Sequence, residues 1–291
     1  MKFRATLKDP AKIAAICKTA SGFHKKVIIK LHEDRVRFIT STGLADGTQV
    51  WTSCRSENLF ADLRLEASRE NTIYIEVDDI SLLFFAMRQC EQATTAAMKL
   101  ARHENTQLLR VMYQHRHTLH DVSQDIPIHV LGESEISAIV APPLERDVVQ
   151  VVLPNLSEIS LFTEKVRSSA HGALLTFAAA RAVPGGPTST NLFTITANTF
   201  TATFSLQYQG VEMPAIAPPE TRDDEDEGVA ETRNVAAVTI DARRFHRFLG
   251  VREVNPIRVV AHLVEERALV LSAYAVGETN LVYYIPASVA H

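Results

Sequence analysis

The chain has 291 residues, 46% hydrophobic and 22% charged, which is typical of a soluble globular protein large enough for two cores. Three scattered cysteines exclude a disulfide scaffold, and no apolar run reaches membrane-spanning length. The net charge is −4, but segment 220–231 alone carries −6, which leaves a mildly basic remainder of +2. Such a remainder permits contact with nucleic acid without requiring it.

The residue pattern of the first half predicts strands interrupted by two helices. Asp9 and Pro10 are a good N-cap and first helical residue, and Lys18 lies roughly opposite the apolar face of that helix. Asp78 and Asp79 precede the second helix. The apolar faces comprise Ile13, Ile16, Cys17 and Ala20 on the first helix, and Ile80, Leu83, Phe84 and Met87 on the second. Strands are expected at 2–8, 27–31, 36–40, 50–54, 59–65, 72–77, 96–102 and 107–113.

Residues 119–147 are predicted to connect two similar halves. Ile126, Ile128 and Val130 alternate, so one face of an extended segment is apolar. Pro127 fixes φ and removes a backbone donor, which favours an edge or crossing segment over a central strand. Residues 142–143 are a Pro-Pro pair. Because a residue that precedes proline favours an extended backbone, the chain is also expected to be extended there.

The second half repeats the order of the first. Pro154 and Asn155 open a helix, and Asp241 opens another. Their inner faces comprise Ile159, Phe162, Thr163 and Val166, and then Phe245, Phe248 and Leu249. Strands are expected at 149–153, 173–179, 192–197, 201–208, 235–240, 258–264, 269–275 and 281–286. The insertions at 182–190 and 213–233, the second strongly acidic, are expected to be mobile loops.

These elements predict an α+β fold of two domains. The stretch 75–78 (Ile-Glu-Val-Asp) before the second helix matches 238–241 (Val-Thr-Ile-Asp) before the fourth. We expect a first domain at 1–118, a connector at 119–147 and a second domain at 148–291, each domain with two helices packed on antiparallel sheet.

Four short motifs resemble one family of DNA clamps. They are Met1 to Ala5, Asp125 to Ile128, Phe248-Leu249 with Val254 to Pro256, and Tyr283 to Ala287. In order and spacing they are similar to the HUS-type subunits of the nine-one-one checkpoint clamp, which has the PCNA-like sliding-clamp fold. The resemblance covers the chain except its two loops.

The resemblance implies a two-domain clamp subunit that is not an enzyme and needs no cofactor. It implies a nuclear heterotrimer with RAD-nine-like and RAD-one-like subunits that encircles double-stranded DNA without sequence preference. It also implies an ATP-driven clamp loader, recruited repair enzymes and a role in checkpoint signalling, with no membrane. The alternative is a replicative PCNA-type homotrimer.

In a clamp, helices line the channel around DNA, so their outer faces should carry bases for phosphates. Arg243 and Arg247 project away from the apolar face of the fourth helix, Arg244 lies on its flank, and Lys18 is the candidate on the first helix. The other interpretation is a merely solvated helix face. The outward positions elsewhere are not basic: Leu82 and Phe85 on the second helix, Ser157 and Glu164 on the third.

Two further surfaces follow from the resemblance. Partners of clamps dock between the connector and the C-terminal segment, and the candidates here are Ile126, Pro127, Ile128, Tyr284, Ile285 and Pro286. Alternatively, these residues pack on one another and nothing docks. Subunits join through edge strands, for which the candidates are Gln107, Leu109, Val111 and Tyr113, and Thr201, Thr203 and Ser205.

Signals for catalysis are weak. His115, His117 and His120 form a loose cluster with poor spacing for zinc, and the Gly-Gly pair at 185–186 lacks the context of a phosphate-binding loop. We therefore expect no metal and no enzyme. A metal-dependent DNA-processing enzyme is the third function class, and it depends on the histidines.

Overall fold

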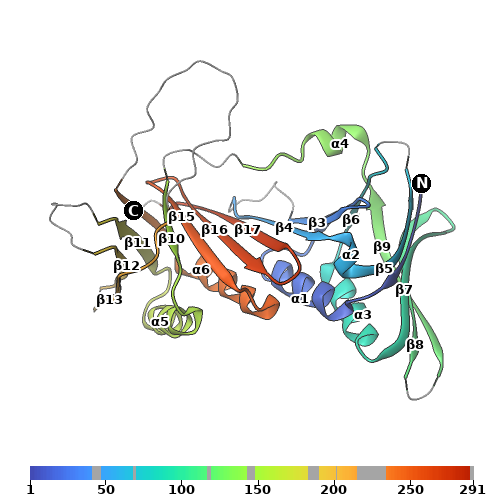
Figure 1. The fold of residues 1–291 in the computed structure, drawn as a ribbon, viewed down its shortest axis with the longest axis horizontal. Helices are drawn as coiled ribbons and strands as arrows, with labels where there is room; N and C mark the ends of the chain where they lie inside the picture. The colour runs from blue at the N-terminus through green and yellow to red at the C-terminus, as the bar shows by residue number, and fades with distance from the viewer. Residues whose placement is uncertain are drawn as a thin grey trace. The chain divides into compact units, whose positions relative to one another are not determined.

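The chain divides into two units, each built from segments far apart in the sequence. The computed structural model describes residues 1–40, 47–67, 70–116, 119–142, 148–182, 190–200, 202–214 and 234–288 (Figure 1). Unit 1 comprises Met1–Ala141, Gly250–Ile257 and Tyr274–Val282, and unit 2 comprises Pro142–Leu249, Arg258–Ala273 and Tyr283–His291. The predicted loops at 182–190 and 213–233 lie largely outside the described residues. The predicted division at 1–118, 119–147 and 148–291 stays a prediction.

Unit 1 contains all the elements predicted for the first half, together with two short helices that the sequence did not predict, α2 and α4. Its elements are β1 (Lys2–Leu7), α1 (Pro10–Ser21), β2 (Val27–Leu31), β3 (Arg35–Thr40), β4 (Gln49–Arg55), α2 (Ser56–Leu59), β5 (Phe60–Glu66), β6 (Ile73–Val77), α3 (Ile80–Cys90), β7 (Ala93–His103), β8 (Thr106–His115), β9 (Asp121–Val130) and α4 (Glu133–Ser137).

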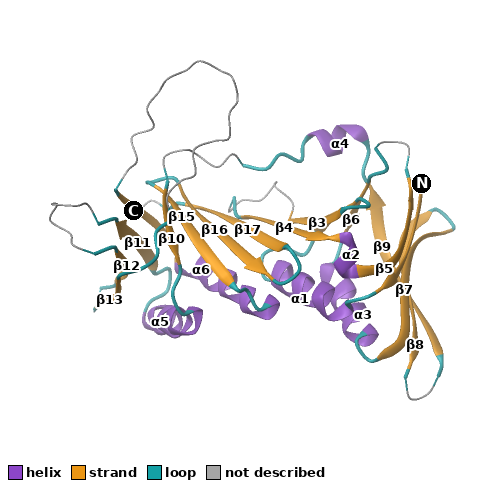
Figure 2. Cartoon of the chain, in the orientation of Figure 1, coloured by secondary structure: helices purple, strands orange, loops and turns teal. Residues whose placement is uncertain are grey.

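The strands of unit 1 pair antiparallel in the order β4-β3-β2-β6-β9-β8-β7-β1-β5. β9 joins the two halves of this sheet, because β8 pairs with it along Asp121–Pro127 while β6 pairs with Ile128, His129 and Val130. Helices α1 and α3 lie side by side (Figures 1 and 2). Helices packed with antiparallel strands confirm the predicted α+β class.

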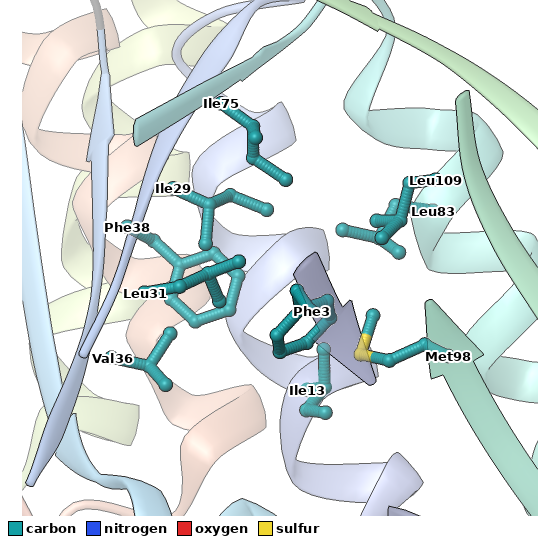
Figure 3. Close-up of a pocket in the computed structure, with 10 residues that line it drawn as sticks. All are labelled: Phe3, Ile13, Ile29, Leu31, Val36, Phe38, Ile75, Leu83, Met98 and Leu109. Atoms are coloured by element: carbon teal, nitrogen blue, oxygen red, sulfur yellow. The ribbon is translucent and has the colours of Figure 1, made fainter. Parts of the chain in front are cut away.

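The core of unit 1 lies between the two helices and both halves of the sheet. Strand alternation and helical spacing bring the apolar faces of all these elements together. A small apolar cavity of about 10 Å³ remains among them (Figure 3). Its lining residues are Phe3, Ile13, Ile29, Leu31, Val36, Phe38, Ile75, Leu83, Met98 and Leu109. A void of this size with no polar lining is a packing gap, too small and too dry for a ligand.

The turn that precedes β17 (Thr279–Pro286) is held in unit 1 by side chains. Asn58 Nδ2 donates to the Gly277 carbonyl at 2.7 Å, and Gly277 has φ +73°, a conformation that favours glycine. Arg55 Nε and Arg35 lie 2.7 and 3.1 Å from the Glu278 carboxylate. These contacts explain why residues 274–282 cluster with unit 1.

Unit 2 repeats the plan on a smaller scale. Its elements are β10 (Val149–Val152), α5 (Leu156–Ser169), β11 (Leu174–Ala180), β12 (Leu192–Asn198), β13 (Thr203–Gln209), β14 (Val235–Asp241), α6 (Ala242–Phe248), β15 (Arg258–Val264) and β16 (Ala268–Ala275), with the end of β17 and a 3₁₀ turn at Leu249–Val254 that begins in this unit. One sheet has the order β13-β12-β11-β14, and β10, β15 and β16 are neighbours in another. Helices α5 and α6 lie side by side (Figure 2).

A chain of aromatic rings ties these elements of unit 2 together. The centroid of Phe245 on α6 lies 4.8 Å from that of Phe177 on β11 and 5.6 Å from that of Phe248. Phe248 in turn meets Tyr283 of β17 edge-on at 5.0 Å. Because all four rings are fully buried, they carry a large share of the apolar surface that this unit removes from water.

Every helix that the sequence predicted begins at its predicted cap. Side-chain oxygens of Asp9, Asp79, Asn155 and Asp241 each accept a hydrogen bond from a backbone N–H in the first turn. Each bond satisfies one of the donors that a helix start leaves without a partner.

Candidate functional site

Helix α1 presents one base on its exposed side. Ile13, Ile16 and Cys17 are buried, whereas Lys18 is exposed, as predicted. Its Nζ lies 5.5 Å from the centroid of the Phe84 ring on α3. The ring holds the ammonium group at the surface without neutralising its charge, so Lys18 stays available to an anion.

Helix α6 presents the basic face that its sequence predicted. Asp241 Oδ1 accepts from the Arg243 backbone at 2.6 Å, which fixes the start of the helix. Phe245 is fully buried, while Arg243 and Arg247 are exposed and Arg244 is partly buried. Arg243 and Arg247 are four residues apart and therefore occupy the same face, one turn from each other.

The remaining helix faces are apolar or mixed. On α3, Leu82 is 39% exposed and Phe85 is 58% exposed. On α5, Leu161 is 68% exposed beside the exposed Glu164. Charge is thus distributed unevenly over the helices. Among α1, α3, α5 and α6, helix α6 is the most basic. Apolar side chains at such positions mark contact surfaces more often than phosphate sites.

The residues predicted for the partner pocket differ in exposure. Ile126, Ile128 and Ile285 are buried in the cores, so their side chains cannot meet a partner. Pro127 is exposed, and Tyr284 and Pro286 are partly exposed. The prediction was wrong for the three isoleucines because alternation shows that residues share a face of a strand, not whether that face is covered.

A second apolar cluster of unit 1 lies under α4. Leu131 packs with Ile28 of β2 and Ile39 of β3, on the side of the sheet opposite the main core. The cluster is completed by Trp51, Tyr74, Ile136 and Ile139, all partly buried. This cluster was not predicted from the sequence, although Ile136 and Ile139 are three residues apart, a spacing that places two side chains on one face of a helix. The connector after β9 is therefore fixed to the sheet by apolar contacts.

Of the two predicted subunit edges, one is wrong. β8, which carries Gln107, Leu109, Val111 and Tyr113, pairs with β7 on one side and with β9 on the other. Its neighbour β9 is the edge over Asp121–Pro127, where the described strands pair with it on one side only. A proline is tolerated at such a position because no partner needs its N–H.

The other predicted edge is present. β13 stands at the end of its sheet and pairs with β12 alone among the described strands. Its side chains Thr203 and Ser205 are exposed, and Thr201 lies outside the described residues. Unpaired N–H and C=O groups along such a strand can pair with a strand of another chain.

Groups for catalysis do not converge in the described structure. No set of three or more His, Cys, Asp or Glu among the described residues could hold a metal ion. His115 and His120 flank a turn, with the His115 N–H bonded to the His120 carbonyl at 3.1 Å, while His117 lies outside the described residues. Burial raises the pKa of Cys54 and Cys90 to about 12, so these thiols are poor nucleophiles at neutral pH. None of the described helices is long and apolar enough to cross a membrane.

Comparison with known proteins finds similarity over nearly the whole chain. A family model described as "Hus1-like protein" matches residues 1–289. "Checkpoint protein HUS1" of Homo sapiens is 23% identical over 299 residues, with 99% of each chain covered. "Checkpoint protein hus1 homolog" of Dictyostelium discoideum is 21% identical, with 98% of each covered, and "Checkpoint protein hus1" of Schizosaccharomyces pombe is 22% identical, also with 98% of each covered. The crystal structure of Proliferating Cellular Nuclear Antigen from Entamoeba histolytica superposes with a TM-score of 0.71 at 9% identity over 99% of each chain.

Proposed function

Because this chain belongs to the Hus1-like family, we propose that it is one subunit of a checkpoint sliding clamp, a ring that encircles DNA and catalyses no reaction. The observation that carries this function is the family match over residues 1–289, on a chain with the fold of Proliferating Cellular Nuclear Antigen. Curated relatives named as checkpoint proteins match over nearly their whole length.

The finer parts of the proposal concern partners and place. We propose that the ring is a heterotrimer with RAD-nine-like and RAD-one-like subunits, placed on double-stranded DNA by a clamp loader in the nucleus. Its task there is to recruit repair enzymes and support checkpoint signalling. The uneven helix faces support a heterotrimer, since three copies of the same apolar α3 surface would face the DNA in a homotrimer.

Contact with DNA is assigned to the helices. Arg243, Arg244, Arg247 and Lys18 can bind phosphates, and nothing in their arrangement favours one base over another. Phosphate contacts position a protein on DNA without reading its sequence. We therefore expect binding that is independent of sequence and weakens steeply with salt.

Ring closure is assigned to the two edges, β9 over Asp121–Pro127 and β13 over Thr203–Gln209. The exposed polar side chains of the β9 edge include Ser123 and Asp125, and those of the β13 edge include Thr203 and Ser205. Pairing between strands of neighbouring subunits would extend the sheets of each across the junction.

The chain alone is expected to remain a monomer at micromolar concentration, and to form a complex of one copy each with RAD-nine-like and RAD-one-like subunits. The reason is that two different neighbours, not a second copy, complement its edges. Sedimentation of the chain alone and of the mixture measures both. A stable trimer of the chain alone would instead establish the PCNA-type alternative.

A further inference from the structure

A row of basic side chains crosses four strands of unit 1, β5, β1, β7 and β8. Strand register places Arg64 of β5 opposite Arg4 of β1, and Arg4 opposite Lys99 of β7. Lys99 is opposite Arg110 of β8, which is opposite Asp125 of β9. Residues directly opposite in antiparallel strands share a face of the sheet. Four bases therefore stand in line over about 14 Å, at roughly 4.8 Å per strand.

The row lies on the face of the sheet that turns away from the core. Each base has a buried sequence neighbour on the opposite face: Phe3, Leu65, Met98 and Leu109. Arg4 and Arg64 are exposed, and Lys99 and Arg110 are partly exposed. An extended ligand lying across the strands could reach all four.

Acidic groups form close ion pairs only with the bases at the ends of the row. Arg110 donates to both oxygens of Asp125 at 2.6 and 2.8 Å and lowers the pKa of that carboxyl. Arg64 lies 3.9 Å from Asp62, and the flanking Lys2 is paired with Glu66. In the described part of the chain, no carboxylate lies within 4 Å of Arg4 or Lys99 at the centre.

This arrangement opposes the stability of the sheet. Like charges directly opposite on neighbouring strands repel, and Arg4 has a base opposite it on both sides. A sheet needs no such row to fold, so its place in the structure points to a ligand that neutralises it.

We propose that this face, defined by Arg64, Arg4, Lys99 and Arg110 and called here the basic row, binds the phosphate backbone of a nucleic acid duplex. Guanidinium groups match phosphate oxygens in pairs, and three of the four bases are arginines. The small Ala97 and Ala101, which flank Lys99 on its own strand and share its face, leave room for a backbone to approach. The choice of duplex DNA over an acidic protein rests on the proposed function.

The basic row is distinct from the helix contacts assigned above. It belongs to the outward side of the sheet of unit 1, whereas α1 packs on the core side of the same unit, so a duplex bound there does not contact α1. The clamp would thus have a second site for DNA that does not depend on ring closure.

The variant R4Q/K99Q tests this inference on the full chain without partner subunits, which cannot encircle DNA. Binding is measured as the anisotropy of a labelled linear duplex of about 30 base pairs, over a series of salt concentrations. Loss of two phosphate contacts should weaken binding and reduce the slope of log affinity against log salt by about 1.8. The melting temperature should stay unchanged or rise, because repulsion in the sheet is relieved.

The matched control is K30Q/R37Q. Lys30 and Arg37 are also opposite each other on neighbouring strands and on the outward side, but they stand between Tyr74 and Ser53, without further bases in their row. This variant has the same net charge as R4Q/K99Q and should bind the duplex as the unchanged chain does. Equal affinities and slopes for the two variants would overturn the inference.

A polyglutamate peptide tests whether the basic row binds an acidic protein instead of duplex DNA. If it binds the unchanged chain but not R4Q/K99Q, while duplex binding is the same in both, the basic row recognises acidic protein and the inference is wrong. Sedimentation with the partner subunits reports the proposed function independently, since R4Q/K99Q should assemble as the unchanged chain does.

Discussion

Phe245→Ala should destabilise unit 2 by about 3–5 kcal/mol, the range for removing a buried phenylalanine ring. Phe245 is fully buried and its ring contacts those of Phe177 and Phe248, so its removal leaves a cavity in the middle of the aromatic chain. The neighbours sit on a strand and a helix and can collapse only partly into that space. Urea unfolding followed by far-ultraviolet circular dichroism measures the loss.

Phe200→Ala is the matched control, because Phe200 is fully exposed in the same unit. We expect its effect to stay within about 0.5 kcal/mol, as for other surface substitutions. Equal effects of the two substitutions would contradict the core placement of Phe245 and of α6 as a whole.

Replacing Arg243, Arg244 and Arg247 together by alanine should weaken the binding of the assembled ring to DNA and reduce its salt slope by about 2.7, if each arginine neutralises one phosphate. Arg243 and Arg247 are exposed and none of the three belongs to the core, so the free energy of unfolding should change by no more than about 0.5 kcal/mol per residue. Binding is measured on rings at several salt concentrations.

The triple lysine variant R243K/R244K/R247K is the control for charge. It keeps three cations on the same helix, so it should retain most of the salt slope that the alanine variant loses. If the alanine variant keeps its DNA affinity and salt slope, these arginines only form a solvated helix face and do not contact DNA.

Helices were the most predictable part of the fold. A polar cap such as Asp9 or Asp241, followed by apolar residues at helical spacing, defines both the start of a helix and its buried face within one stretch of chain. Arg243 and Arg247 could be placed at the surface for the same reason, since Phe245 and Phe248 fixed the inner face. Phe84 and Phe162 are less buried than predicted, as they lie at the margins of these faces.

Strand order was not predictable in this way. Periodicity located β8 and part of β9, but it contains no information on which strands pair. β8 was therefore assigned to an edge, whereas β9 returns beside it and pairs along Asp121–Pro127. The edge character inferred from Pro127 applies to β9 itself.

The surfaces on the sheet of unit 1 could not be predicted either, because their prediction also requires knowing which strands pair. The basic row is invisible in the sequence because Arg4, Arg64, Lys99 and Arg110 are isolated bases until strand register lines them up. The cluster of Trp51 and Tyr74 with Ile136 and Ile139 likewise requires the return of the chain over the sheet. Long-range pairing, not local propensity, brings each of these sets together.

The central claim, that this chain is part of a ring around DNA, is tested most directly by topology. Rings assembled with the partner subunits are loaded onto closed circular DNA by a clamp loader and washed at high salt, which removes contacts made only to phosphates. We expect the chain to stay on the circle and to be released when a single cut makes the DNA linear. A chain lost from the closed circle in the wash, or retained after the cut with both ends free, would contradict encirclement.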